Sequence, residues 1–87
     1  MDKPTISLVI ADDHPLILAG IAALIESEPG FALLGQAVNA AQAVEQYERL
    51  RPDVLLIDLN MPGGGGLEAI RAIRGGEAGK VVFEVAD

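Results

Sequence analysis

The chain has 87 residues, enough for one domain of ordinary size and for no second one. Its formal net charge is −7 with only 6 Lys and Arg residues, which excludes the clustered basic surface that direct binding to nucleic acid requires. Because the sequence has no cysteine, disulfides, thiolate catalysis and zinc–thiolate sites are excluded, and a reducing compartment is expected.

The first part of the chain shows a strand pattern, a helix pattern and a second strand pattern in turn. An apolar run over residues 5–11 predicts the first strand. Pro15 suits the first turn of a helix, where its missing N–H costs nothing, and apolar residues at helical spacing follow as far as Pro29 and Gly30. Residues 31–36 predict the second strand. The residues expected to face the core from this first helix are Leu18, Ile21, Leu24 and Ile25.

The middle of the chain predicts a second helix and a buried strand. Asn39 is suited to cap a helix that continues to Arg51, and Pro52 closes it. Residues 54–57 form a continuous β-branched and leucine run, which is typical of a strand buried on both faces of a parallel sheet. The side chains expected to face the core from the second helix are Ala40, Val44, Tyr47 and Leu50.

The last part of the chain repeats the alternation. Residues 67–74 predict a third helix after a glycine-rich loop, and residues 80–85 predict a fourth strand. Connections of about twenty residues between successive strands require parallel neighbours joined by right-handed helical crossovers. We therefore predict one α/β domain over residues 1–87, a flavodoxin-like doubly wound parallel sheet whose strands, numbered along the chain, lie in the order 2-1-3-4.

Nothing in the sequence predicts contact with a membrane. Residues 1–4 have neither the charge pattern nor the apolar core of a signal peptide. The longest apolar run, residues 16–25, is too short to cross a bilayer. We expect a cytoplasmic protein.

Carboxylates follow two of the predicted strands. Asp12 and Asp13 come directly after the first strand, and Asp58 comes directly after the third. The first and third strands lie side by side where the strand order reverses, so their carboxyl ends bring the three carboxylates together. Each close pair repels by about 4 kcal/mol at an intermediate dielectric, so a neutralising group is expected. A hard cation such as Mg²⁺ suits this site, and beside it Asp58 can act as a nucleophile for phosphoryl transfer.

Two motifs resemble the receiver domain of bacterial two-component response regulators. The first is Ile-Ala-Asp-Asp-His-Pro at residues 10–15, and the second is Pro-Asp-Val-Leu-Leu-Ile-Asp-Leu-Asn-Met-Pro-Gly at residues 52–63. The Asp-Asp-His-Pro form is closest to the branch whose members carry a C-terminal helix-turn-helix DNA-binding domain. The resemblance covers essentially the whole chain.

The resemblance implies a function for each acidic residue. Asp58 matches the residue that is phosphorylated by a sensor histidine kinase. Asp12 and Asp13 match the acidic pair that binds Mg²⁺, with Asp58 and the backbone carbonyl of Asn60 completing the metal site. The implied protein is a signalling module that performs no enzymatic reaction beyond its own phosphorylation from a phosphodonor.

The sequence departs from the family pattern toward its end. Receivers continue after the fourth strand into another helix, a fifth strand that ends in a functional Lys, and a last helix, whereas the given sequence ends at Asp87. The family's Ser or Thr switch position falls on Glu84, which cannot donate a hydrogen bond when ionised. We therefore expect a truncated receiver without an output domain. Its fourth strand would leave an exposed apolar edge, which predicts a partner there. The simplest partner is a second copy, giving a homodimer through that strand, and the alternative is the missing half if the sequence is a fragment of a longer product.

Three hypotheses about function remain after the sequence is taken alone. The first is a receiver that accepts a phosphoryl group on Asp58. The second is a receiver impaired in phosphorylation that acts as a dimerising interaction module through its fourth strand. The third, a Mg²⁺-dependent phosphohydrolase, is the weakest because the sequence offers no general acid or base beyond the acidic cluster.

Simpler interpretations stand beside these functional ones. Asp58 can be a carboxylate that caps a turn, and Asp12 and Asp13 can belong to a solvated loop and a helix cap. We assign His14 to capping or packing rather than to a metal or phosphohistidine role.

Overall fold

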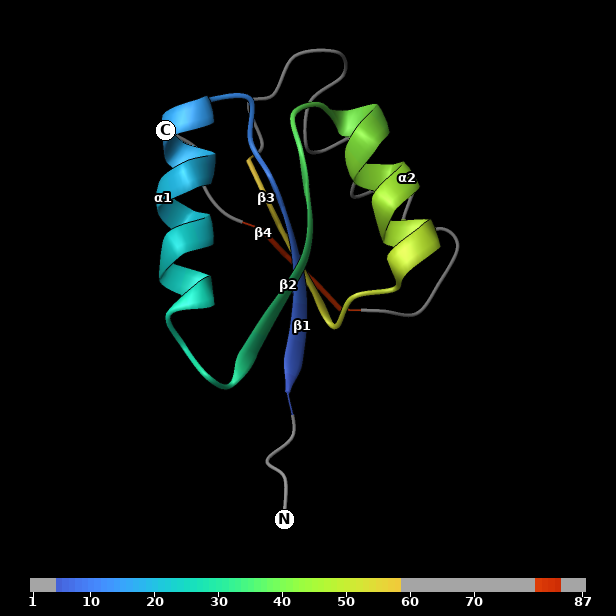
Figure 1. The fold of residues 1–87 in the computed structure, drawn as a ribbon. Coiled ribbons are helices and arrows are strands. Elements are labelled where there is room, and N and C mark those ends of the chain that lie inside the picture. Colours follow the sequence, from blue (N-terminus) through green and yellow to red (C-terminus); the bar gives the residue numbers. More distant parts are fainter. Residues whose placement is uncertain (1–4, 59–79, 84–87) are drawn as a thin grey trace.

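The computed structural model of the protein describes residues 5–58 and 80–83. All four strands are parallel and form one sheet in the predicted order, β2-β1-β3-β4. The two described helices lie on opposite faces of the sheet (Figure 1), so the predicted doubly wound α/β fold is confirmed. The elements are β1 (Ile6–Ala11), α1 (Pro15–Glu26), β2 (Phe31–Ala37), α2 (Ala40–Leu50), β3 (Val54–Ile57) and β4 (Lys80–Phe83).

The predicted boundaries agree with the structure to within a few residues. The helix expected over residues 67–74 and the end of the fourth strand lie outside the described residues. Neither described helix has the length and apolar character needed to cross a membrane.

Strand β1 supplies side chains to both halves of the core. It pairs with β2 on one side and with β3 on the other, so both of its edges are hydrogen-bonded. Successive side chains of a strand point to opposite faces. Val9 and Ala11 accordingly pack under α2, whereas Leu8 and Ile10 pack under α1. Because both faces of the strand are buried, its sequence is a nearly continuous run of apolar residues.

Helix α1 packs on the sheet through a set of residues that differs from the predicted one at one position. Leu18, Ala22 and Ile25 are buried and Ile21 is partly buried against them. The prediction for Leu24 was wrong, because its side chain is 69% exposed. Leu24 lies six positions after Leu18, about 240° around the helix, so the smaller Ala22 one turn after Leu18 takes the core position.

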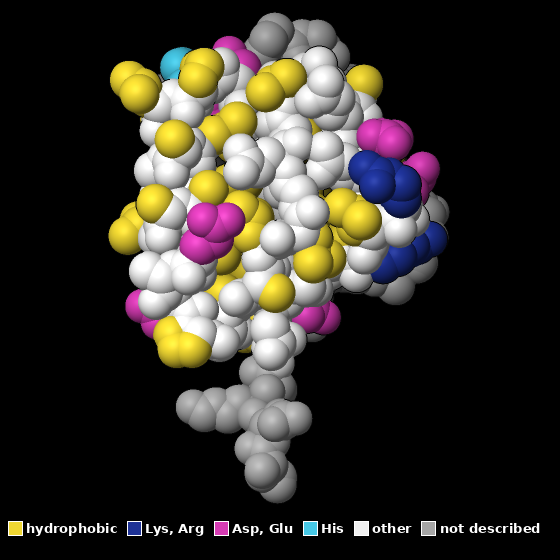
Figure 2. Space-filling model, in the orientation of Figure 1, with side chains coloured by type: hydrophobic (Ala, Val, Ile, Leu, Met, Phe, Trp, Pro, Cys, Tyr) yellow, Lys and Arg dark blue, Asp and Glu magenta, His cyan; other side chains and the backbone are white. Residues whose placement is uncertain are grey.

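Helix α2 begins and ends as the sequence predicts. The Asn39 side chain accepts a hydrogen bond from the Gln42 backbone N–H at 2.8 Å, which confirms the predicted cap. Arg51 ends the helix in the left-handed conformation, with φ 50°, and its N–H donates to the Tyr47 carbonyl. Ala40 and Tyr47 are buried as expected, Val44 and Leu50 are partly buried, and Ala43 joins them. The Lys and Arg side chains visible in Figure 2 gather over this helix.

Ser7 and Asp53 join β1 to β3 at the amino ends of the two strands. The Ser7 N–H and hydroxyl donate to Asp53 Oδ2 at 2.9 and 3.0 Å. In return, the Asp53 N–H donates to Ser7 Oγ at 2.8 Å and to the Ser7 carbonyl at 3.0 Å. These reciprocal bonds fix the register of β3 against β1 before the strands reach their carboxyl ends.

Strand β2 contains one residue more than its pairing with β1 needs. Leu8 lies opposite Leu33, but the next residue, Val9, lies opposite Gly35, so Leu34 is an unpaired bulge residue. Because of this extra residue, the side chains after the bulge point to the faces opposite to those they would have in a regular strand. Leu33 therefore packs on the α1 side and Ala37, four residues later, packs on the α2 side, although an uninterrupted strand would place both on one face.

The space around Gly35 generates a prediction about stability. A Cβ atom at this position would collide with Gln46 Oε1 and lie 3.2 Å from Leu50 Cδ1. Gln46 cannot move away without weakening the 2.7 Å bond from its Nε2 to the Gln36 carbonyl. We expect Gly35→Ala to lower the free energy of unfolding by about 1–3 kcal/mol, measured by urea denaturation.

Gly20 provides the matched control for that substitution. A Cβ atom there meets nothing within 4 Å, and the residue lies within α1. Gly20→Ala should therefore raise the free energy of unfolding by up to about 1 kcal/mol. Equal stability of Gly35→Ala and the unsubstituted chain would contradict the packing described between β2 and α2.

The Asn39 cap generates a second prediction. Asn39→Ala removes the acceptor for the Gln42 N–H and should cost about 1 kcal/mol of unfolding free energy in the same assay. Asn39→Asp keeps an acceptor oxygen and should remain close to the unsubstituted chain. A loss of the same size in both variants would show that the hydrogen bond is not what stabilises the start of α2.

Candidate functional site

The pairing of β1 with β3 brings two aspartates to one edge of the sheet. Ala11 lies opposite Ile57, so the residues that follow, Asp12 and Asp58, leave the sheet side by side. The Asp58 N–H donates to the Ala11 carbonyl and the Asp12 N–H donates to the Ala37 carbonyl, each at 3.0 Å. The backbone therefore positions both carboxylates.

Asp13 reaches the same place because β1 ends before it. In a continuing strand, Asp12 and Asp13 would point to opposite faces. Here the strand stops at Ala11, the chain bends, and α1 begins at Pro15. The proline restricts His14 to an extended backbone, with φ −103° and ψ 111°, and the His14 N–H donates to Asp12 Oδ1 at 2.9 Å.

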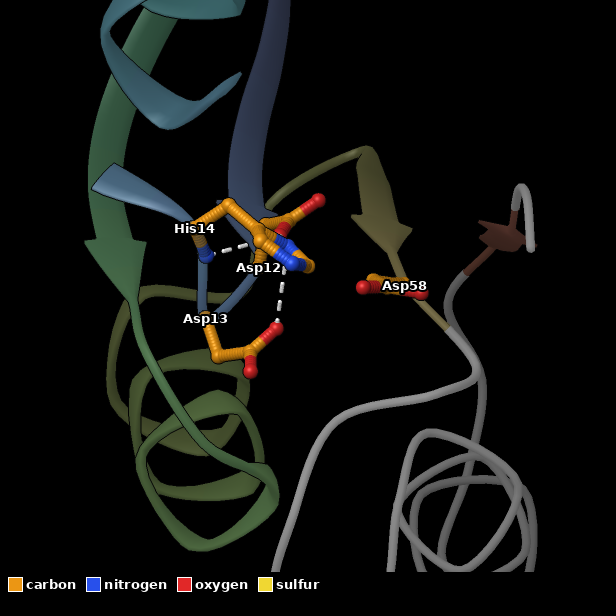
Figure 3. A group of neighbouring side chains, drawn as sticks. All are labelled: Asp12, Asp13, His14 and Asp58. Carbon is orange, nitrogen blue, oxygen red and sulfur yellow. Dashed lines mark hydrogen bonds and ion pairs between the residues drawn. The ribbon is translucent and has the colours of Figure 1, made fainter. Parts of the chain in front are cut away.

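Four side chains converge at this edge of the sheet, as Figure 3 shows. Asp12, Asp13, His14 and Asp58 each offer one potential ligand atom, and these atoms all lie within 4.8 Å of one another. Asp58 is the most buried of the four, with 8% of its surface exposed. The structure thus gathers Asp12, Asp13 and Asp58 where the sequence places them. Asn60 and Glu84, the other two predicted site residues, lie outside the described residues, and their roles stay predictions.

His14 belongs to this cluster, which the sequence analysis did not anticipate. It occupies the N-cap position of α1, but its side chain makes no cap hydrogen bond within the described part of the chain. The predicted cap position is confirmed, but the side chain is 54% exposed and was wrongly expected to cap or pack. Instead, Nδ1 lies 2.8 Å from Asp12 Oδ1 and 3.2 Å from Asp13 Oδ1. The available signal was its position directly after two aspartates.

The acidic neighbours stabilise the charged form of His14. The hydrogen bond to the Asp12 carboxylate, followed by the charge of Asp13, raises the pKa of the imidazole above its ordinary value of 6.5. The charges of Asp12 and Asp58 act in the same direction. The direction of the shift follows from the carboxylates gathered at this edge of the sheet.

One oxygen of the cluster is left without a hydrogen bond. Asp13 Oδ1 is buried and accepts none from the residues that the structure describes. His14 Nδ1, 3.2 Å away, is close enough for an electrostatic attraction, but its hydrogen-bond contact is with Asp12 Oδ1 at 2.8 Å. A buried carboxylate oxygen without a donor is costly unless a cation neutralises it.

The donor set fits a hard divalent cation. Mg²⁺ prefers carboxylate and carbonyl oxygens and retains several waters. The three aspartates supply such oxygens within reach of one another, and Asp13 Oδ1 is an oxygen that a cation would satisfy. The cluster can therefore hold Mg²⁺ through Asp12, Asp13 and Asp58.

Comparison with known proteins agrees with this geometry. The family model of the response regulator receiver domain matches residues 8–86. The nitrate/nitrite response regulator protein NarL of Escherichia coli K12 is 41% identical over 68 residues, which cover 78% of this chain and 32% of that protein. NarP of the same organism is 39% identical over 82 residues, which cover 92% of this chain and 38% of that protein.

A solved structure gives the same result in three dimensions. The signal receiver domain of the putative response regulator NarL from Mycobacterium tuberculosis superposes with a TM-score of 0.88 and 30% identity, over 93% of this chain and 66% of that one. The chain spans about a third of the length of the curated relatives, 32% of NarL and 38% of NarP. With matching motifs, fold and acidic cluster, the chain belongs to the response regulator receiver domain family.

Proposed function

We propose that this chain accepts a phosphoryl group on Asp58 from a sensor histidine kinase, with Mg²⁺ bound at the acidic cluster. The observation that carries the proposal is the position of Asp58. It follows the buried strand β3, is 8% exposed, and lies with Asp12 and Asp13 in one cluster at the sheet edge. Membership of the receiver family supports the same assignment.

The chemistry asks little of the chain beyond positioning a nucleophile. A carboxylate oxygen of Asp58 attacks the phosphorus of a phosphohistidine, forming an acyl phosphate while the P–N bond breaks and the leaving imidazole takes up a proton. The backbone bond from Asp58 to Ala11 keeps the nucleophile in place during the attack. Family membership further supports a cytoplasmic signalling role in which the chain performs no other enzymatic reaction.

The negative charge of the cluster explains why a cation is part of the proposal. Three carboxylates within a few ångströms repel an incoming phosphoryl group. Asp12, Asp13 and Asp58, with the backbone carbonyl of Asn60, would hold Mg²⁺. When bound, that ion supplies charge neutralisation for the phosphoryl oxygens.

The dimerising module is not the function we adopt. The three aspartates needed for phosphorylation are all present and close together, which favours a receiver that has kept its chemistry. Pairing of two chains through β4 stays a prediction.

Phosphorylation of Asp58 can be measured directly. We expect the chain to gain the mass of one phosphoryl group after incubation with acetyl phosphate and Mg²⁺, measured by intact mass spectrometry. Asp58→Asn removes the nucleophile and should reduce the phosphorylated fraction by about 100-fold or more. Leaving out Mg²⁺ should reduce it strongly as well, because the repulsion within the cluster is then not neutralised.

Asp53 provides the matched control, since it lies at the other end of β3 and outside the cluster. Asp53→Asn keeps an acceptor for Ser7 and should be phosphorylated like the unsubstituted chain. A mass gain that survives Asp58→Asn, or that is absent from a chain shown to bind Mg²⁺, would reject the proposed function.

A further inference from the structure

We propose that the imidazole of His14 is an internal substitute for the divalent cation, which holds Asp12 and Asp13 in the ion-free chain and leaves when Mg²⁺ binds. The inference rests on the proposed function, because it requires Mg²⁺ to bind at these aspartates. In this proposal, His14 is not a ligand of the cation, but it lowers the affinity of the site for the cation by competing with it.

The position of the ring is the first observation. His14 Nδ1 lies 2.8 Å from one oxygen of Asp12 and 3.2 Å from one oxygen of Asp13, and Figure 3 shows the ring between these two carboxylates. A cation bound by these two Oδ1 atoms would take the lone pairs that Nδ1 faces, at about 2.1 Å from each oxygen ligand. The positive end of the N–H bond and a divalent cation repel each other, so the two cannot occupy this space together.

The ligand preference of Mg²⁺ indicates whether the ion displaces the imidazole or is coordinated by it. Mg²⁺ is a hard cation that takes oxygen ligands and keeps water, whereas imidazole suits softer transition metals. The ring nitrogen that faces the cluster already lies at hydrogen-bond distance, 2.8 Å, from Asp12 Oδ1. For Mg²⁺ we therefore infer that the ring moves out of the site.

The ring can leave at little cost to the fold. The side chain is 54% exposed, and in the described part of the chain it makes no cap hydrogen bond to α1. Its departure breaks the contacts of Nδ1 with Asp12 Oδ1 and Asp13 Oδ1. The backbone N–H of His14 continues to donate to Asp12 Oδ1 at 2.9 Å, so the loop retains a bond that orients this carboxylate.

An NMR titration with Mg²⁺ of the full chain tests the inference. The affinity is obtained from backbone amide shifts near Asp12 and Asp58 at one fixed pH and ionic strength. His14→Ala removes the competitor, so we expect it to bind Mg²⁺ about 3- to 10-fold more tightly than the unsubstituted chain, the effect of one exposed hydrogen bond to a charged group. Leu16→Ala is the matched control, because Leu16 is also in the first turn region of α1 but is 85% exposed and outside the cluster, and its affinity should be unchanged.

The ring provides a second measurement on the unsubstituted chain. The sequence contains 1 histidine, so one set of imidazole signals reports on His14 alone. At saturation with Mg²⁺ these signals should move to the shifts of a solvent-exposed histidine in a short peptide at the same pH.

Each other outcome contradicts the inference in a distinguishable way. Equal affinity in His14→Ala, or ring signals that stay in place at saturation, would overturn the inference and leave the proposed function standing. Weaker binding in His14→Ala would also overturn it, since the ring would then be a ligand. If Mg²⁺ binds to neither chain, both the inference and the metal requirement of the proposed function fail.

Discussion

The parallel pairing of β1 with β3 is the constraint on which the site depends. At the amino ends, the reciprocal bonds between Ser7 and Asp53 set the register, and at the carboxyl ends the bond from Asp58 to Ala11 continues it. Side chains alternate along a strand, so a slip of one residue would turn Asp58 toward the opposite face. The chemistry at one edge therefore relies on hydrogen bonds made at the other.

The acidic cluster is compatible with a stable core because it lies just beyond it. Val9, Ala11 and Ile57 belong to the apolar cluster under α2, and the carboxylates follow only where the strands end. At that point three carboxylates and the imidazole of His14 lie together. Repulsion within a cluster of this kind raises the energy of the chain, and a bound cation would offset that cost.

Much of this could be predicted from the sequence because strong local signals agree with the topology. Pro15 and Asn39 mark the starts of the helices, and the apolar run before Asp58 marks a central strand. Leu24 was wrongly predicted to face the core because the prediction gave more weight to its hydrophobicity than to its angle around the helix. For the same reason, Ala22 was not predicted to be buried. The contacts of His14 could not be predicted, because they depend on a bend that turns three consecutive side chains toward one point. Asn60 is supported only by its position in the second motif, and Glu84 only by the family pattern at the fourth strand.

The bulge at Leu34 has a consequence for how the length of β2 can vary. Leu33 lies opposite Leu8 and Gly35 lies opposite Val9. If Leu34 were absent, these two residues would be consecutive and would still point to the faces that they occupy now. In effect, β2 is a regular strand that carries a single-residue insertion. Deleting Leu34 would leave the side chains of the neighbouring residues on their present faces of the sheet. Deleting a residue between Gly35 and Ala37 would instead move side chains that precede the deletion to the opposite face. Among related sequences, Leu34 is therefore the position of β2 where a gap is structurally neutral.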